Sequence, residues 1–167
     1  IKGPSKKIFA ILRYGNVNMS RGSVIPFFLN NKGNEYGVTD AGMTRFCMSL
    51  DKSVKAAHWV LKNAKGGEVF IPKTSSYRIV DLVKAINKNA KMNIIGIRPG
   101  EKLSEELIAE NENENIFNQE KFFIISKKNS YKNLKKVKKP FSYTSANNKE
   151  FCSIDELKKI IFNSNSH

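Results

Sequence analysis

A short, unbroken apolar run near the start of the chain is the feature that most restricts its fold. Ile8-Phe9-Ala10-Ile11-Leu12 does not alternate with polar residues, a pattern typical of a strand buried on both faces of a helix-covered parallel sheet. Strand-like runs at 69–71 and 92–97 follow, separated by helical patterns at 24–31, 50–64 and 78–87. This alternation predicts an α/β fold, in which ligands bind at the carboxyl ends of strands.

The remaining segments give weaker predictions. A helix is expected over 101–109, a strand at the edge of a sheet over 121–126, and a final helix over 155–162. Ser153 and Glu156 have the spacing of a capping box, and Asp51 is a candidate N-cap for helix 50–64, which Gly66-Gly67 would end. Segments 110–120 and 127–140 are polar or rich in lysine and are predicted to be flexible loops.

The composition excludes several classes of protein. With 167 residues and 40% hydrophobic content, the chain can bury a core, and no run approaches the roughly 20 apolar residues of a membrane span. Because no secretion signal is recognisable either, we expect a cytoplasmic location. Cys47 and Cys152 are far apart in sequence and lack the spacing of metal ligands, so we expect reduced, structural thiols.

The net charge of +14 raises the possibility of nucleic-acid binding. The excess consists mostly of lysines spread along the chain, and no basic stripe interleaved with aromatic residues can be drawn. The cluster of lysines between 121 and 139 is interpreted as a solvated loop. We therefore expect no nucleic-acid partner, although a non-enzymatic basic module that binds nucleic acid remains the alternative from a different functional class.

Gly96-Ile97-Arg98-Pro99-Gly100-Glu101 is a candidate phosphate site. Pro99 fixes φ and Gly100 tolerates left-handed geometry, so a sharp turn can present Arg98 and Glu101 on one rim. A guanidinium fork suits phosphate, and a carboxylate accepts hydrogen bonds from hydroxyl or amide donors. The alternative is an ordinary turn with a surface ion pair.

A second candidate is the loop after the first strand, from Asn16 to Val24. Gly15 and Gly22 permit close approach of the backbone, while Asn16, Ser20 and Arg21 supply donors. These properties suit a nucleotide.

The Gly-rich motif that binds dinucleotides is missing from these residues. No two glycines form a G-x-G arrangement, so the chain carries no Gly-rich fingerprint. Tyr131 and Lys135 match Tyr-x-x-x-Lys, but the match is expected by chance in so lysine-rich a chain, and we reject it as catalytic. His58 and Trp59 fall inside a predicted helix and are interpreted as packing residues.

Together, the segments at 13–28, 39–46, 67–73 and 96–103, with the ending at 141–157, resemble the C-terminal half of the inverting UDP-N-acetylglucosamine 4,6-dehydratases. These enzymes form a branch of the extended short-chain dehydrogenase/reductases. The resemblance implies the C-terminal part of a Rossmann-like fold with a small substrate-binding α/β subdomain. It also implies that residues 1–167 are one substrate-binding portion, lacking an upstream NADP-binding half that carries the catalytic Tyr-x-x-x-Lys.

The resemblance also assigns roles. It implies that the UDP-sugar is contacted by Asn16, Val24, Thr39, Arg98 and Glu101, and that NADP is bordered by Val17, Asn18, Met19, Ser20 and Arg21. Arg45 is either a second phosphate cation or part of a buried ion pair. The sequence departs from the family at Asn18-Met19, where a small pair with glycine is usual, at Cys47 in place of an aromatic residue, and at Ser104 in place of histidine.

The complete enzyme implied by the resemblance would oxidise C4 of a UDP-N-acetylhexosamine with NADP, eliminate water across C5 and C6, and return the hydride to C6 with inversion at C5. A homo-oligomer is expected for the full-length enzyme. The alternative within the same superfamily is a nucleotide-sugar 4-epimerase.

Overall fold

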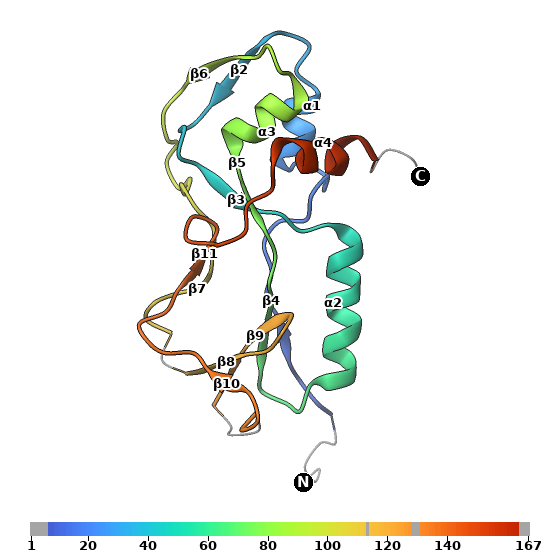
Figure 1. Ribbon diagram of the computed structural model, residues 1–167, viewed down its shortest axis with the longest axis vertical. Helices are drawn as coiled ribbons and strands as arrows, with labels where there is room; N and C mark the ends of the chain where they lie inside the picture. The colour runs from blue at the N-terminus through green and yellow to red at the C-terminus, as the bar shows by residue number, and fades with distance from the viewer. Residues whose placement is uncertain (1–6, 113, 128–130, 164–167) are drawn as a thin grey trace.

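The computed structural model describes residues 7–112, 114–127 and 131–163. The N-terminal strand belongs to a five-stranded sheet in the order β1-β4-β9-β8-β10, in the lower half of Figure 1. Its strands are β1 (Ile11–Leu12), β4 (Val69–Pro72), β9 (Phe122–Ser126), β8 (Asn115–Asn118) and β10 (Lys135–Lys136). Only β1 and β4 pair in parallel, and the other three pairings are antiparallel.

Helix α2 (Leu50–Asn63) covers one face of this sheet. Its N-cap is Ser49, whose side chain accepts a hydrogen bond from the backbone N–H of Lys52, so the prediction of Asp51 as N-cap was wrong. Asp51 instead lies in the first turn and pairs with Lys55 at 2.7 Å. The helix ends before Gly66, as predicted from the two glycines, both of which have positive φ.

The other face of the sheet is covered by β7 (Glu106–Ile108) and β11 (Tyr143–Thr144), an antiparallel pair. Leu107, Ile108 and Tyr143 pack there against Ile71 and Ile125. Because apolar layers cover both faces, the central strands of the sheet are buried. The prediction that the run Ile8–Leu12 is a strand buried on both faces of a parallel sheet was wrong: only Ile11–Leu12 form a strand, it is the terminal strand of a mostly antiparallel sheet, and Ile11 is 58% exposed.

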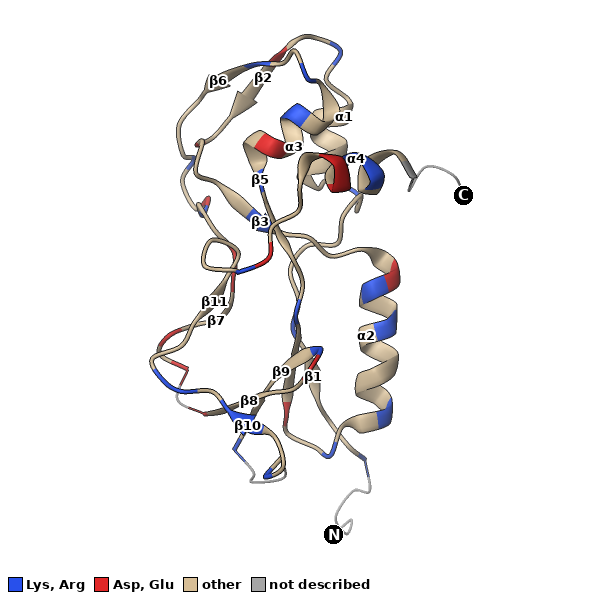
Figure 2. Ribbon diagram, in the orientation of Figure 1, with Lys and Arg blue, Asp and Glu red and all other residues tan. Residues whose placement is uncertain are grey.

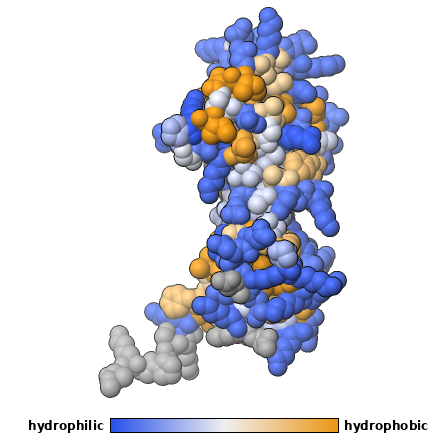
Figure 3. All heavy atoms as spheres, turned by 90° about the vertical axis from the view of Figure 1, so that its left-hand side faces the viewer, coloured by the Kyte–Doolittle hydropathy of each residue, from blue (hydrophilic) through white to orange (hydrophobic). Residues whose placement is uncertain are grey.

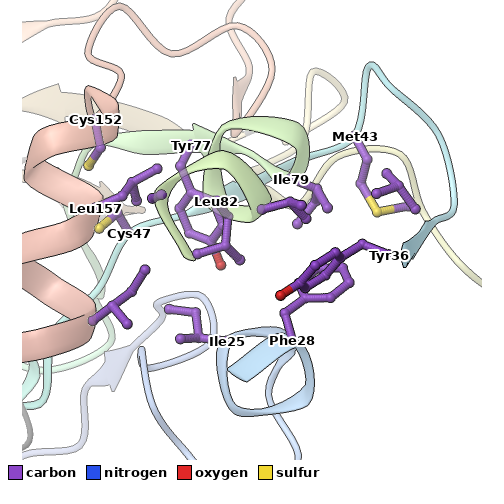
Figure 4. Close-up of a cluster of buried hydrophobic side chains, with 14 residues drawn as sticks. Ile25, Phe28, Tyr36, Met43, Cys47, Tyr77, Ile79, Leu82, Cys152 and Leu157 are labelled. Atoms are coloured by element: carbon purple, nitrogen blue, oxygen red, sulfur yellow. The ribbon is translucent and has the colours of Figure 1, made fainter. Parts of the chain in front are cut away.

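The upper half of the molecule in Figure 1 contains the other helices and two short sheets. The helices are α1 (Val24–Leu29), α3 (Ile79–Ile86) and α4 (Ile154–Asn163). Strand β2 (Glu35–Val38) pairs in parallel with β6 (Lys91–Ile94), and β3 (Thr44–Phe46) pairs antiparallel with β5 (Ser76–Arg78). Their shared core includes Phe28, Tyr36, Leu82 and Leu157 (Figure 4).

The two thiols, distant in sequence, lie at the same end of this core (Figure 4). Cys47 and Cys152 are both buried and free. The interaction between the two thiols lowers the pKa of Cys152 to about 6 and, together with burial, raises the pKa of Cys47. Within the described residues, no group of three or more possible metal ligands occurs.

The α/β class predicted from the sequence is confirmed, and several elements are corrected. Residues 101–109 form no helix but end in β7. The strand at 121–126 exists as β9, but it lies between β4 and β8 rather than at an edge. The strand predicted at 92–97 is shorter than expected, because its pairing with β2 ends at Ile94.

The two predicted loops also contain paired residues. Strand β8 lies within 110–120, and β10 lies within 127–140. Lys128, one of the lysines of the basic cluster, is outside the described residues. Figure 2 shows basic residues on the elements of both halves of the molecule rather than on one face. No helix in the described ranges combines the length and apolar character that crossing a membrane requires.

Candidate functional site

A hollow of about 680 Å³ lies between α1, the ends of β2 and β3, and the turn that follows β6. Five of the six predicted substrate residues line it: Val24, Thr39, Arg45, Arg98 and Glu101. Figure 3 shows that apolar surface is gathered in the upper part of this side of the molecule, surrounded by hydrophilic residues. The hollow therefore combines an apolar wall with a few polar groups, as small-molecule sites do.

A smaller hollow of about 80 Å³ contains the sixth predicted residue, Asn16. It shares Gly22, Val24 and Arg45 with the larger hollow. Asn16 and Arg98, which are 82 positions apart in sequence, thus line adjoining spaces that meet at Arg45. The structure brings together the two segments singled out from the sequence.

The turn at 96–101 has the geometry expected from its proline and glycines. Gly96 and Gly100 have φ of 84° and 82°, and the N–H of Glu101 donates to the carbonyl of Arg98 at 3.0 Å. The Glu101 carboxylate accepts hydrogen bonds from Thr39 Oγ1 at 3.1 Å and from the N–H of Arg98 at 3.4 Å. Glu101 therefore braces the turn. Arg98 forms no ion pair within the described part of the chain, which leaves its guanidinium available to an anion.

Arg45 is held by backbone carbonyls. Its Nη1 donates to Thr44 O at 2.7 Å and to Leu103 O at 3.3 Å. No carboxylate of the described ranges lies within 4 Å of it, so the alternative of a buried ion pair is not realised there. The side chain is thus fixed in orientation while it faces both hollows.

Glu105 is a site residue that the sequence reasoning missed. Its Oε2 accepts a hydrogen bond from the N–H of Phe46 at 2.8 Å, and it lies 3.1 Å from the position that a Cβ on Gly15 would occupy. Burial raises the pKa of this carboxyl, while the Phe46 N–H and Arg45 lower it. Gly15, three residues after the end of β1, was the available signal, because a side chain there would crowd the carboxylate.

Glu105 also explains why residues 101–109 are not helical. Its N–H donates to Ser145 Oγ at 2.9 Å, and its carbonyl accepts from the N–H of Ser145 at 2.8 Å. Leu103 O accepts from the N–H of Thr44 at 2.9 Å. These bonds to distant segments hold the backbone extended and override its local helix propensity.

The predicted cofactor residues divide into two groups. Val17 and Asn18 line the smaller hollow, and the Asn18 N–H donates to Met48 O at 2.7 Å. Met19, Ser20 and Arg21 follow in a turn and line neither hollow. Met19 has φ of 64° and packs against the core, and it belongs to the pair Asn18-Met19, where the resemblance implies a small pair with glycine.

Ser23 is the N-cap of α1, yet its side chain makes no capping hydrogen bond. Its Oγ is buried and has no hydrogen-bond partner among the described residues, and Ser23 lines the smaller hollow. A buried hydroxyl without a partner is costly, so it is available to a bound water or ligand.

Known proteins match this chain over most of its length. Residues 1–127 match the family described as polysaccharide biosynthesis protein. The inverting UDP-N-acetylglucosamine 4,6-dehydratase of Campylobacter jejuni is 40% identical over 96% of this chain and 53% of its own length. A UDP-glucose 4-epimerase of Rickettsia bellii is 33% identical over 95% of this chain and 50% of its own.

Among solved structures, Pen from Bacillus thuringiensis is 36% identical, with a TM-score of 0.79 over 94% of this chain and 50% of that one. The chain thus spans about half the length of the curated relatives it matches. The family match covers most of the chain, and the resemblance noted in the sequence is confirmed: the chain belongs to the polysaccharide biosynthesis protein family.

Proposed function

We propose that this chain is the UDP-sugar-binding part of an NADP-dependent, C5-inverting UDP-N-acetylglucosamine 4,6-dehydratase. The observation that carries the proposal is the pair of adjoining hollows, with Arg98 in one, Asn16 in the other and Arg45 at their junction. Relatives with this printed activity match nearly the whole chain.

The residues of the site suit a nucleoside diphosphate. Arg98 and Arg45 provide two guanidinium groups around one space, and such groups bind phosphate oxygens with charge-assisted hydrogen bonds. Thr39 and Glu101 form the adjacent rim, where hydroxyl groups of a ribose would find partners. In this assignment the sugar end reaches the smaller hollow, beside Asn16 and Ser23.

The residues next to that hollow would border the nicotinamide of NADP, and most of the cofactor would be bound outside this chain. Val17 and Asn18 are backed by Met48, whereas the space beside Gly15 is filled by Glu105 and Phe46 of this chain. The cofactor would supply hydride acceptance at C4 and hydride return at C6 of the sugar. This chain's own residues would hold the diphosphate so that the sugar meets the cofactor.

The decisive measurement is UDP binding to this chain by calorimetry. We expect Arg98→Ala to weaken binding by about 2 kcal/mol, roughly thirtyfold in Kd, because a charge-assisted phosphate contact is lost. Arg78→Ala is the matched control, since Arg78 is also largely exposed but lines neither hollow. Equal affinity of the Arg98→Ala and Arg78→Ala variants would contradict the assignment.

A 4-epimerase is the second candidate, and the Rickettsia relatives of that name favour it. The two activities share the oxidation at C4 and differ in the later steps, which are elimination of water in one case and return of the hydride to C4 in the other. Only the product made by an assembled enzyme separates them.

A further inference from the structure

We infer that a separate hollow at the end of β4 binds a monosaccharide that carries one acidic group. This hollow, the Lys73 hollow, has a volume of about 590 Å³ and lies between Lys73 and Thr74, which follow β4, and residues of the segment 140–150. Its described lining residues include none of those that line the two hollows proposed for the UDP-sugar. The inference therefore concerns a second ligand and does not depend on the proposed function.

Lys73 places a fixed cation in this hollow. Its Nζ donates hydrogen bonds to Asn118 Oδ1 at 2.6 Å and to Glu120 O at 3.2 Å, and it lies 4.9 Å from the centroid of the Phe123 ring. The ammonium has a third N–H, for which the described residues provide no acceptor, and none of their carboxylates lies within 4 Å of Nζ. An ammonium held in this way, without a counter-ion, is a partner for an anion.

The charge balance of the Lys73 hollow also favours an anion. Lys73 is only partly exposed, and burial lowers its pKa, although Glu150 and Glu120 raise it. Burial disfavours the charged form of the lysine, and an acidic group of a ligand would offset this cost. Two lysines, Lys73 and Lys149, line the hollow together with one glutamate, Glu150, so a single negative charge on the ligand balances them.

Much of the lining of the Lys73 hollow is apolar. It includes two half-buried phenylalanines, whose ring centroids are 5.1 Å apart, and three other side chains with apolar surface: Phe123, Phe141, Val137, Pro140 and Tyr143. The C–H face of a pyranose is apolar and packs on such side chains, whereas its hydroxyl groups need a few polar partners. The apolar lining therefore suits one face of a sugar ring.

Polar side chains supply partners for the hydroxyl groups. Ser142 Oγ accepts a hydrogen bond from Asn147 Nδ2 at 2.9 Å, which leaves the proton of its own hydroxyl group to be donated. Lys149 and Glu150 are exposed and line the same hollow, so they add a donor and an acceptor. A sugar ring would use both the apolar side chains and these polar groups, whereas an aromatic acid would use only the apolar ones.

The Lys73 hollow is preformed, because hydrogen bonds tie its two sides together. Tyr143 Oη accepts from the N–H of Thr74 at 3.0 Å and donates to Thr74 O at 2.9 Å. Asn148 Nδ2 also donates to Thr74 O, at 2.7 Å. These bonds hold the segment that carries Phe141 and Ser142 against the end of β4. A preformed site loses little free energy to ordering when a ligand binds, which favours binding of a small ligand.

The test titrates the unaltered chain with four probes, and calorimetry and amide chemical shifts measure the binding. Glucuronic acid carries a carboxylate and glucose 6-phosphate a phosphate, glucose is the neutral control, and benzoate is an apolar anion without hydroxyl groups. We expect one or both acidic sugars to bind and to shift the amide signals of Lys73, Phe141 and Ser142, with glucose and benzoate weaker by about tenfold or more. The acidic sugar that binds more tightly identifies the acidic group as a carboxylate or a phosphate.

Substitutions of Lys73 locate the site. Lys73→Met keeps an unbranched side chain beside Phe123 but removes the charge, and it should weaken binding of the acidic sugar by about tenfold or more. Lys73→Arg keeps a cation and should retain most of the affinity. Lys121→Met is the matched control, because Lys121 is exposed and does not line the hollow, so it should change the affinity by less than about twofold. Excess UDP should not displace the acidic sugar, because the two ligands would occupy separate hollows.

Any of four results would overturn the inference: no binding of either acidic sugar, equally tight binding of glucose or benzoate, equal effects of Lys73→Met and Lys121→Met, or displacement by UDP. Displacement would place the acidic sugar in the site proposed for the UDP-sugar. The comparison of the four probes uses the unaltered chain, so it does not depend on how a variant folds. It is also made without UDP, so its failure is distinct from a failure to bind UDP.

Discussion

Met19 has a left-handed backbone, which costs a non-glycine residue about 1 kcal/mol or more. We therefore expect Met19→Gly to be more stable than Met19→Ala by about 1 kcal/mol, although glycine is usually the less stable of the two. Urea unfolding of both variants measures the difference. The matched pair Lys55→Gly and Lys55→Ala, at an exposed position inside α2, should show the usual order. If the alanine variant is the more stable one at both positions, the backbone of Met19 is not strained.

Glu105 should make stability depend on pH. Burial raises the pKa of its carboxyl above the ordinary 4.5, so the folded state holds this proton more tightly than the unfolded chain does. The free energy of unfolding then falls as pH rises from 4.5 through the folded pKa. Glu105→Gln removes this titration, and we expect its unfolding free energy to decline less over the same window.

The control for Glu105 is its neighbour Glu106, which is exposed at the start of β7. Glu106→Gln should keep the pH slope of the parent chain. Chemical unfolding gives the free energy of unfolding at each pH. If this free energy changes with pH equally in Glu105→Gln and in the parent chain over this window, the argument from burial is wrong.

At the scale of elements, Tyr131 anchors a segment that the sequence suggested was a loop. Its hydroxyl donates to Glu68 Oε1 at 3.0 Å, and the buried Glu68 carboxylate also accepts from the N–H groups of Lys65 and Gly66. We expect Tyr131→Phe to lower the free energy of unfolding by about 1.5 kcal/mol, because a hydrogen bond to a buried charge is lost. Thermal or urea unfolding measures this effect.

Tyr14→Phe is the control, because Tyr14 is exposed. A Tyr131→Phe variant as stable as that control would show that the segment is not anchored by this bond. The contact also supplies a structural role for Tyr131, in agreement with its rejection as a catalytic tyrosine from sequence.

Elements with strong local patterns were predictable, and those made by distant partners were not. Helix α2 follows from apolar spacing and from the glycines that end it, although its N-cap is Ser49 rather than Asp51. Helix α4 follows from apolar spacing and from the Ser153–Glu156 capping box, in which Glu156 Oε2 accepts from the N–H of Ser153 at 2.8 Å. Residues 101–109 have good helix formers, yet their bonds to Thr44, Phe46 and Ser145 are invisible in a local reading. Tertiary context overrode propensity there.

The same division holds for the site. Arg98 and Asn16 could be singled out because glycines and a proline mark their turns in the sequence. Glu105 could not, since its role comes from the packing of β3, the first loop and Ser145 around one carboxylate. Residues that act by contact between distant segments carry no local signal.

At the scale of the whole molecule, we expect this chain to bind the substrate without catalysing the reaction. The 167 residues hold two guanidinium groups beside a nucleotide-sized space, but no G-x-G fingerprint, and their Tyr-x-x-x-Lys match is structural. We expect this chain alone to bind UDP and to convert no UDP-N-acetylglucosamine when NADP is added. Measurable turnover by the isolated chain would contradict the proposal that it is the substrate-binding part.

Joined to the dinucleotide-binding half of the Campylobacter jejuni dehydratase, the chain should produce a UDP-4-keto-6-deoxy sugar, because in the proposed assignment Arg98 and Arg45 hold the diphosphate so that the sugar meets a bound cofactor. Nuclear magnetic resonance of the product distinguishes this sugar from a C4 epimer. Arg98→Ala in this chimera should raise KM more than it lowers kcat, since it removes binding remote from the reacting carbons. A C4 epimer as the main product would instead establish the epimerase alternative.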